Sequence, residues 1–241
     1  MQDIKTIVRG DDGRSPPAFP GLGPAARRSL FTAVATAFLM LGTAGNGAAA
    51  PNQRPSDPFG KTTVKELAYE PLAETWSVLR KQIQLDDLIV SSCIDTETDE
   101  CVAAKKLMSV VDDARQYQGR AIIGHINRSI NLMIKSSEGG WTSALDTLKL
   151  GSGDCKDYSI AKYAALLRAG VSPAHVRLII VHDTARNEHH MVVGVYEDGH
   201  WLLMDNLTML LVKDIDRRGY DPEFVLDETG VRRFVSPVKK G

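Results

Sequence analysis

Residues 151–158 read GSGDCKDY, and an apolar run with helical spacing follows them directly. The apolar residues recur at intervals of four and three positions, and they are Ile160, Ala164 and Leu167. Gly170 ends the pattern, so the spacing predicts a helix that begins near Cys155. Asp154 stands where an N-cap residue is favoured. We therefore expect Cys155 in the first turn, where unpaired N–H groups and the helix dipole stabilise an anion and favour the reactive thiolate.

Three amphipathic helices are predicted before this stretch. Apolar residues recur every three to four positions over residues 72–83, 107–117 and 122–133. Such stripes are typical of helix surfaces that face a core, so we assign them no chemistry. The pattern over residues 141–150 is ambiguous between a helix and a loop.

After Gly170 the period changes to that of strands. Residues 176–181, 190–196 and 201–205 are rich in β-branched and aromatic residues, and shorter runs follow at 210–212, 224–226 and 231–235. Helices come first and strands follow, which predicts an α+β fold. The expected arrangement places the N-terminal helices and a central helix that begins at Cys155 against an antiparallel sheet.

The Asp198-Gly199 pair is a strong signal for a two-residue hairpin turn. With that loop, counting back along both strands places Val192 opposite Asp205. Side chains alternate between faces, so His190 shares the face of Val192. His190 and Asp205 are then diagonal neighbours, close enough for the imidazole ring to contact the carboxylate.

A three-residue loop would change the parity of the hairpin and bring His189 to the Asp205 face instead. The sequence of the turn favours the two-residue loop, and therefore His190. The other histidines lie in the middle of a helix, at turns or at a strand end, and they are His125, His175, His182 and His200.

Length and composition suit one globular domain with a leader. The chain has 241 residues, of which 43% are hydrophobic and 24% charged, and its formal net charge is −1. This charge gives no reason to expect nucleic acid as a partner. Residues 1–50 are interpreted as a leader with an export signal, because Arg27-Arg28 precede a short apolar run and small residues. A membrane anchor is the alternative, but the run is short for a span.

The leader sets the expected domain limits and compartment. Residues 51–61 are polar, contain two prolines and are interpreted as a linker, and residues 62–241 as the folded domain. Export to the periplasm makes a disulfide plausible between Cys93 and Cys101, which flank a short polar loop. Cys155 is then the unpaired cysteine of the chain.

These features predict a cysteine hydrolase with a triad. Cys155 is the candidate nucleophile, and His190 removes its proton and later donates one to the leaving group. Asp205 orients the ring and stabilises the imidazolium. Backbone N–H groups around Cys155 are candidates for the oxyanion site. No organic cofactor is needed for this chemistry.

Two other classes of function fit the same sequence. In the first, the domain is a non-catalytic envelope binding module in which the three residues are structural. In the second, the triad transfers an acyl group, because a thioester can be resolved by an amine instead of water. The export signal, the helix start and the hairpin register agree with one another, and this agreement favours the hydrolase.

Asp154 and Asp157 flank the candidate nucleophile with carboxylates that suit a hard cation such as calcium. An equally simple interpretation is that they are an N-cap residue and a first-turn acid that face the helix dipole. The pair His189-His190 with Cys155 lacks the ligand spacing of a structural zinc site.

The motifs Gly-Asp-Cys-Lys-Asp-Tyr at 153–158, His-Met-Val-Val at 190–193 and Leu-Met-Asp-Asn at 203–206 resemble a known family. They are similar to the bacterial transglutaminase-like cysteine proteinases, the LapG-type periplasmic proteases. The resemblance extends from about Trp76 to Phe234. It implies a papain-like or transglutaminase-like cysteine protease fold with a Cys155, His190 and Asp205 triad.

The resemblance also implies a substrate, a partner and a metal. Members of this family cut the N-terminal region of large surface adhesins and so control biofilm attachment. An inner-membrane receptor for cyclic di-GMP sequesters the protease. Calcium binds near the catalytic cysteine, which corresponds here to Asp154 and Asp157. Lys156 departs from the family pattern, in which an acidic residue often follows the cysteine.

Overall fold

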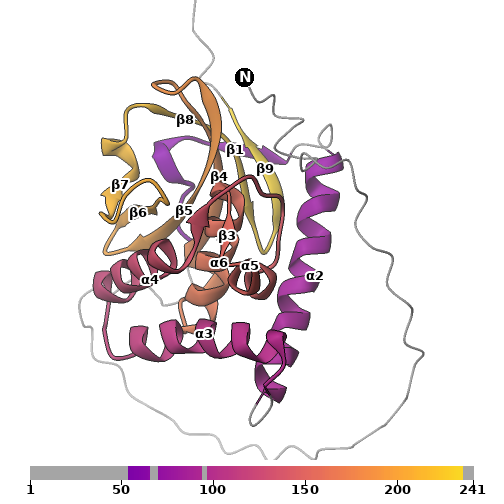
Figure 1. The fold of residues 1–241 in the computed structure, drawn as a ribbon. Helices are drawn as coiled ribbons and strands as arrows, with labels where there is room; N and C mark the ends of the chain where they lie inside the picture. The colour runs from indigo at the N-terminus through magenta and orange to yellow at the C-terminus, as the bar shows by residue number, and fades with distance from the viewer. Residues whose placement is uncertain (1–53, 66–69, 94–96, 236–241) are drawn as a thin grey trace, which may run out of the picture. The chain divides into compact units, whose positions relative to one another are not determined.

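The computed structural model describes residues 54–65, 70–93 and 97–235. The predicted leader, residues 1–50, lies outside this part of the chain. The fold within it is the expected mixture of helices and an antiparallel sheet (Figure 1).

Five helices form one layer. They are α2 (Glu70–Ser92), α3 (Asp99–Ala114), α4 (Arg120–Met133), α5 (Ala144–Leu150) and α6 (Cys155–Arg168). The three predicted amphipathic helices and the helix that begins at Cys155 are confirmed. The ambiguous region 141–150 contains α5, whose N-cap Ser143 accepts a hydrogen bond from the backbone N–H of Asp146.

Seven strands form the sheet, in the order β1 (Thr63–Lys65), β9 (Gly230–Phe234), β8 (Tyr220–Asp227), β4 (Val176–Asp183), β5 (Glu188–Glu197), β6 (His200–Met204) and β7 (Val212–Lys213). All neighbouring pairs in this sheet are antiparallel. A separate pair of two-residue strands, β2 (Lys135–Ser136) and β3 (Ser152–Gly153), runs in parallel beside the start of α6. The predicted strand at 210–212 is displaced, because Leu210 lies exposed in the preceding loop.

The hairpin register is confirmed. Glu197 pairs with His200 and Tyr196 with Trp201 across a two-residue turn. Asp198 and Gly199 both have positive φ angles, 48° and 79°. This is the backbone conformation that an Asp-Gly turn supplies, and it fixes the parity of β5 against β6.

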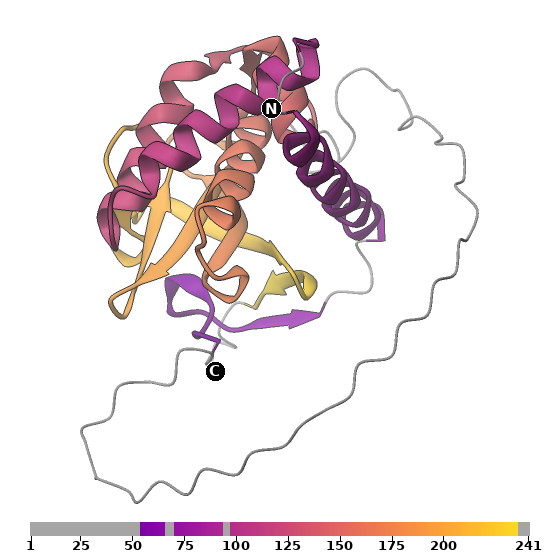
Figure 2. The same cartoon turned by 90° about the horizontal axis from the view of Figure 1, so that it is seen from below.

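α6 is the buried centre of the helical layer. Its residues from Lys156 to Leu166 are buried, and it contacts α3, α4 and α5 as well as β4 and β5. The helices and the sheet appear as two layers when the molecule is turned (Figure 2). Successive residues of β4 face different clusters, since Leu178 belongs to the core shared with the helices and Ile179 to a second core on the other face.

The linker prediction does not hold for residues 54–61. Trp201 donates a 2.9 Å hydrogen bond from Nε1 to the carbonyl of Ser56, and Asp57 lies 2.7 Å from Arg232. A 3₁₀ helix, Pro58–Gly60, buries Pro58. These partners are more than 140 residues away in sequence, so the composition of the segment gave no sign of them.

A disulfide joins Cys93, which follows α2, to Cys101 in the first turn of α3, with the two Cα atoms 5.2 Å apart. This separation is usual for a disulfide. Closing so short a loop stabilises the fold by about 2–3 kcal/mol in the chain-entropy model. The bridge fixes the turn between two helices that pack against each other.

Candidate active site

The start of α6 is held by reciprocal hydrogen bonds between two aspartates. Oδ1 of Asp154 accepts from the backbone N–H of Lys156 at 2.8 Å, and Oδ2 of Asp157 accepts from the backbone N–H of Asp154 at 2.9 Å. This is a capping box, which satisfies N–H groups that the first turn of a helix leaves unpaired. Cys155 is the first residue of the helix, as expected.

A glycine-containing loop closes over this helix start. The backbone N–H of Thr142 donates to Oδ1 of Asp157 at 3.0 Å. A Cβ atom at Gly139 would lie 2.1 Å from Oδ2 of Asp157, so a side chain there would displace the carboxylate. The loop and the capping box therefore require each other.

Cys155 is partly exposed and is the cysteine that remains outside the disulfide. The side chain of His190 interacts with it. His190 lies on β5 and is buried, and Asp205 directly follows β6 and is also buried. Nε2 of His190 is 2.8 Å from Oδ1 of Asp205. The three predicted triad residues thus meet at one place.

The charges of the pair support each other. Burial by itself lowers the pKa of His190, but the hydrogen bond with Asp205 and the contact with Cys155 raise it to about 9. Burial by itself raises the pKa of Asp205, but His190 and Tyr220 lower it to about 2. The arrangement favours an imidazolium beside a carboxylate throughout the neutral range.

Asp205 has further partners that sequence reasoning missed. Tyr220 at the start of β8 donates a 2.6 Å hydrogen bond to Oδ2 of Asp205. The backbone N–H of Leu207 donates to Oδ1 at 3.0 Å, and Asn131 of α4 donates to the backbone carbonyl of Asp205 at 2.8 Å. No local pattern marks Tyr220 or Asn131, because both reach Asp205 only through tertiary contacts.

His189 does not reach the triad. It belongs to the opposite face of β5, where Nε2 lies 3.2 Å from Oε2 of Glu223 and the ring packs against His182. The alternative hairpin register, which would have used His189, is therefore excluded by the structure.

The predicted metal residues have their carboxylate oxygens occupied. Asp154 accepts backbone hydrogen bonds and forms an ion pair with the ammonium of Lys156, and Asp157 accepts from Thr142 and Asp154. Burial and the charge of Asp154 raise the pKa of Asp157 to about 6. Within the described ranges, no group of three or more His, Cys, Asp or Glu side chains is placed to hold a metal ion.

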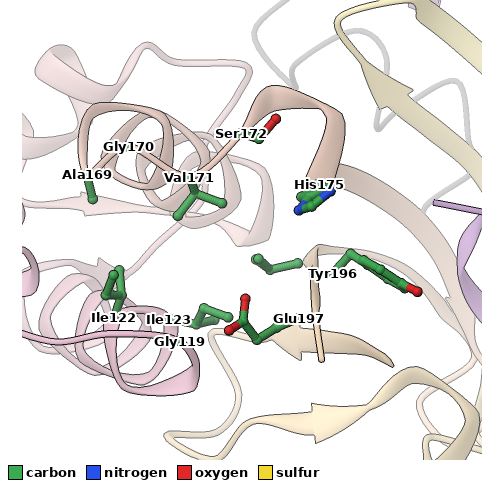
Figure 3. Close-up of a pocket in the computed structure, with 11 residues that line it drawn as sticks. Gly119, Ile122, Ile123, Ala169, Gly170, Val171, Ser172, His175, Tyr196 and Glu197 are labelled. Atoms are coloured by element: carbon green, nitrogen blue, oxygen red, sulfur yellow. The ribbon is translucent and has the colours of Figure 1, made fainter. Parts of the chain in front are cut away.

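A cavity of about 220 Å³ lies at the other end of α6 (Figure 3). Its walls come from the start of α4, the end of α6 and the outer end of β5, and include Ile123, Val171, His175 and Glu197. The helix is 14 residues long, so this cavity is about 20 Å from Cys155 along the axis. It does not belong to the candidate active site.

Comparison with known proteins agrees with this site. A family model described as bacterial transglutaminase-like cysteine proteinase matches residues 90–226. A solved structure of Legionella pneumophila LapG is 20% identical with a TM-score of 0.53, and the alignment covers 61% of this chain and 87% of that chain. Calcium-bound LapG from the same organism is 20% identical with a TM-score of 0.51, covering 69% of this chain and 93% of that chain. At this identity the likeness shows the fold. No curated protein sequence matches this chain.

Proposed function

The chain belongs to the bacterial transglutaminase-like cysteine proteinase family, and on this premise we propose that it is a cysteine endopeptidase with Cys155, His190 and Asp205 as its triad. One observation carries the proposal. The buried His190–Asp205 pair, 2.8 Å apart, interacts with the free cysteine at the first residue of α6.

The geometry assigns each proton a place. Asp205 engages Nε2 of His190, which leaves Nδ1 as the nitrogen that serves the thiol of Cys155. The thiol proton passes to His190, and the sulfur attacks the scissile carbonyl carbon. The negative oxygen that forms is stabilised at the start of α6, where we assign the backbone N–H of Cys155 as a donor.

Two further proton transfers complete the reaction. His190 donates its proton to the leaving amine, and the C–N bond breaks to give a thioester on Cys155. Water then attacks the thioester while His190 takes a proton from it. The C–S bond breaks, the acid product leaves and Cys155 regains its proton. Asp205 remains charged and stabilises the imidazolium in each step.

We also propose that the enzyme acts in the periplasm. The support is the export signal in residues 1–50 and the disulfide, a bond that persists in oxidising compartments. Among the described residues, no helix combines the length and apolar character that a membrane span requires.

The family resemblance extends the proposal to a substrate and a partner. The substrate is the N-terminal region of a large surface adhesin, whose cleavage releases cells from a biofilm. The partner is an inner-membrane cyclic di-GMP receptor that sequesters the protease. Support for both comes from the motifs around Cys155, His190 and Asp205.

Calcium enters the proposal through the relatives, because one LapG structure is described as calcium-bound. In this chain the resemblance assigns calcium to Asp154 and Asp157. Their oxygens are taken by N–H groups and by Lys156, so these residues do not fit a calcium ion as they stand. We therefore assign no catalytic step to calcium.

The test is cleavage of a defined substrate. Purified wild type and Cys155→Ala are incubated with the N-terminal segment of a large surface adhesin from the same cell, and the products are weighed by mass spectrometry. We expect wild type alone to give two fragments whose masses sum to the substrate plus one water. Cleavage by Cys155→Ala would overturn the assignment of the nucleophile, and a product that gains an amine would favour acyl transfer.

A further inference from the structure

Lys156 is an unusual residue to find buried at a helix start. It follows Cys155 directly and its residue exposure is only 5%. Its ammonium forms an ion pair with Oδ2 of Asp154, while its backbone N–H donates to Oδ1 of the same carboxylate at 2.8 Å. Lys156 and Asp154 are therefore linked at two points. Buried lysines are rare unless they are paired in this way.

The two aspartates need a positive charge close by. Asp157 is 1% exposed, and the side chain of Asp154 is 22% exposed. Two carboxylates that share a hydrogen-bonded turn repel each other, and the charge of Asp154 contributes to the raised pKa of Asp157. A cation in contact with this pair offsets the repulsion and part of the cost of burying the charges.

Calcium does not fit this place without breaking bonds that the chain makes itself. It takes six to eight oxygen ligands at about 2.3–2.6 Å. Oδ1 of Asp154 accepts from two backbone N–H groups, and Oδ2 faces the ammonium of Lys156. Both oxygens of Asp157 accept from backbone N–H groups, those of Thr142 and Asp154.

We infer that Lys156 is a positioning residue whose ammonium takes the place of a divalent cation beside Cys155. The chain carries its own counter-ion, so the capping box and the loop at Thr142 are held without calcium. The inference deepens the proposed function, because the element that Lys156 holds is the one that carries the proposed nucleophile. It concerns metal binding and stability, so it is tested without substrate.

The first test uses the wild-type protein. Its Tm is measured with millimolar calcium chloride and with EGTA, and calcium binding is measured by isothermal titration calorimetry. We expect no shift in Tm between the two conditions and no binding heat at the site. A Tm that rises with calcium, or falls with EGTA, would overturn the inference.

The second test removes the internal cation. Lys156→Met and Lys156→Glu leave the aspartates without their counter-ion, so both variants are expected to melt about 6 °C or more below wild type in EGTA. Calcium should raise the Tm of Lys156→Glu toward that of wild type. Lys156→Met keeps the test open if the glutamate variant does not fold, since it should also gain a calcium response. If neither variant responds to calcium, the ammonium does not stand in for a divalent cation.

A matched control and a second readout separate positioning from general stability. Lys149 pairs with Glu100 at 2.8 Å on the exposed surface, so Lys149→Met should show no calcium response. Alkylation of Cys155 by iodoacetamide should be slower in Lys156→Glu with EGTA and faster again with calcium. An alkylation rate that does not follow calcium would overturn the positioning role. These results stand even if wild type cleaves no adhesin, so failure of the two proposals can be distinguished.

Discussion

The hydroxyl of Tyr220 donates a 2.6 Å hydrogen bond to Oδ2 of Asp205. The other oxygen of the same carboxylate lies 2.8 Å from Nε2 of His190. Tyr220 also packs its ring against His190, with the ring centroids 5.8 Å apart, and Arg217 stacks on the ring of Tyr220. Asp205 is thus held from two sides, which fixes the plane in which it meets the imidazole.

Tyr220→Phe should lower kcat/KM by about 10-fold. The variant keeps the ring but removes a hydrogen bond to a charged group, which typically contributes about 1.5–3 kcal/mol. Asp205 then orients His190 less well. The control is Tyr196→Phe, because Tyr196 packs against Trp201 and His175 and does not contact the triad. Equal activity of Tyr220→Phe and wild type would show that the hydroxyl does not position Asp205.

His190→Ala should reduce the cleavage rate by roughly 10²–10⁴-fold, the usual contribution of a general acid–base group. His189→Ala is the matched control, since it removes the adjacent histidine, which faces Glu223 on the other side of the sheet. Its activity should stay close to that of wild type. Alkylation of Cys155 at neutral pH gives a second measurement, and it should slow only in the His190 variant. A larger loss in His189→Ala would contradict the assignment.

Stability should depend on pH through the same pair. The pKa of His190 is raised from 6.5 to about 9, so its contribution is complete below pH 6.5 and is lost as pH rises through about 9. The pKa of Asp205 is lowered from 3.8 to about 2, so its contribution is complete above pH 3.8 and is lost as pH falls through about 2. Both contributions are therefore present together between about pH 4 and 6.5.

Urea unfolding of wild type and His190→Ala between pH 5 and pH 10 measures this effect. The difference in free energy of unfolding should be largest at the acidic end and should shrink as pH rises through about 9. A difference that stays constant over this range would mean that His190 gains no charge stabilisation from Asp205.

Lys162→Met should make the protein more stable at pH 6. Lys162 lies on α6 with no solvent exposure, and its ammonium has no hydrogen-bond partner among the described residues. Burial lowers its pKa to about 7, against the opposing attraction of Asp205. The folded state therefore holds a poorly compensated charge below pH 7, at a cost of about 1–3 kcal/mol.

The gain from Lys162→Met should disappear with rising pH. Between pH 7 and 10.5 the folded state has already lost the proton while the unfolded state keeps it, so wild type recovers stability there. Chemical unfolding at pH 6, 8 and 10 checks this trend. A variant that is less stable than wild type at pH 6 would show that the ammonium has a favourable partner in solution.

Local sequence accounts for much of the candidate site. The Asp198-Gly199 turn is a short-range signal, and it sets the register that brings His190 to the Asp205 side of the hairpin. Asp154 is an N-cap residue, and the apolar period behind it places Cys155 at the first residue of α6. Both features depend on residues fewer than about ten positions apart, so no knowledge of the rest of the fold is needed.

Other parts of the site depend on residues far apart in the chain. Tyr220 reaches Asp205 because β8 pairs with β4, placing Tyr220 opposite Asp183 just as His190 lies opposite Val181. The polar segment from Arg54 to Lys61 folds onto the sheet because its charges meet partners more than 150 residues later. Composition alone favoured a linker there, since ion pairs between distant residues leave no periodic pattern.

The sequence by itself determined the order of helices and strands, the start of α6, the hairpin register and therefore the three candidate catalytic residues. Only the tertiary structure decided what holds them: the hydroxyl of Tyr220 on Asp205, the loop at Thr142 over Asp157 and the burial of the Lys156–Asp154 ion pair. The physical reason is range. Turns, caps and amphipathic periods are set by neighbouring residues, whereas burial and counter-ions depend on which distant elements pack together.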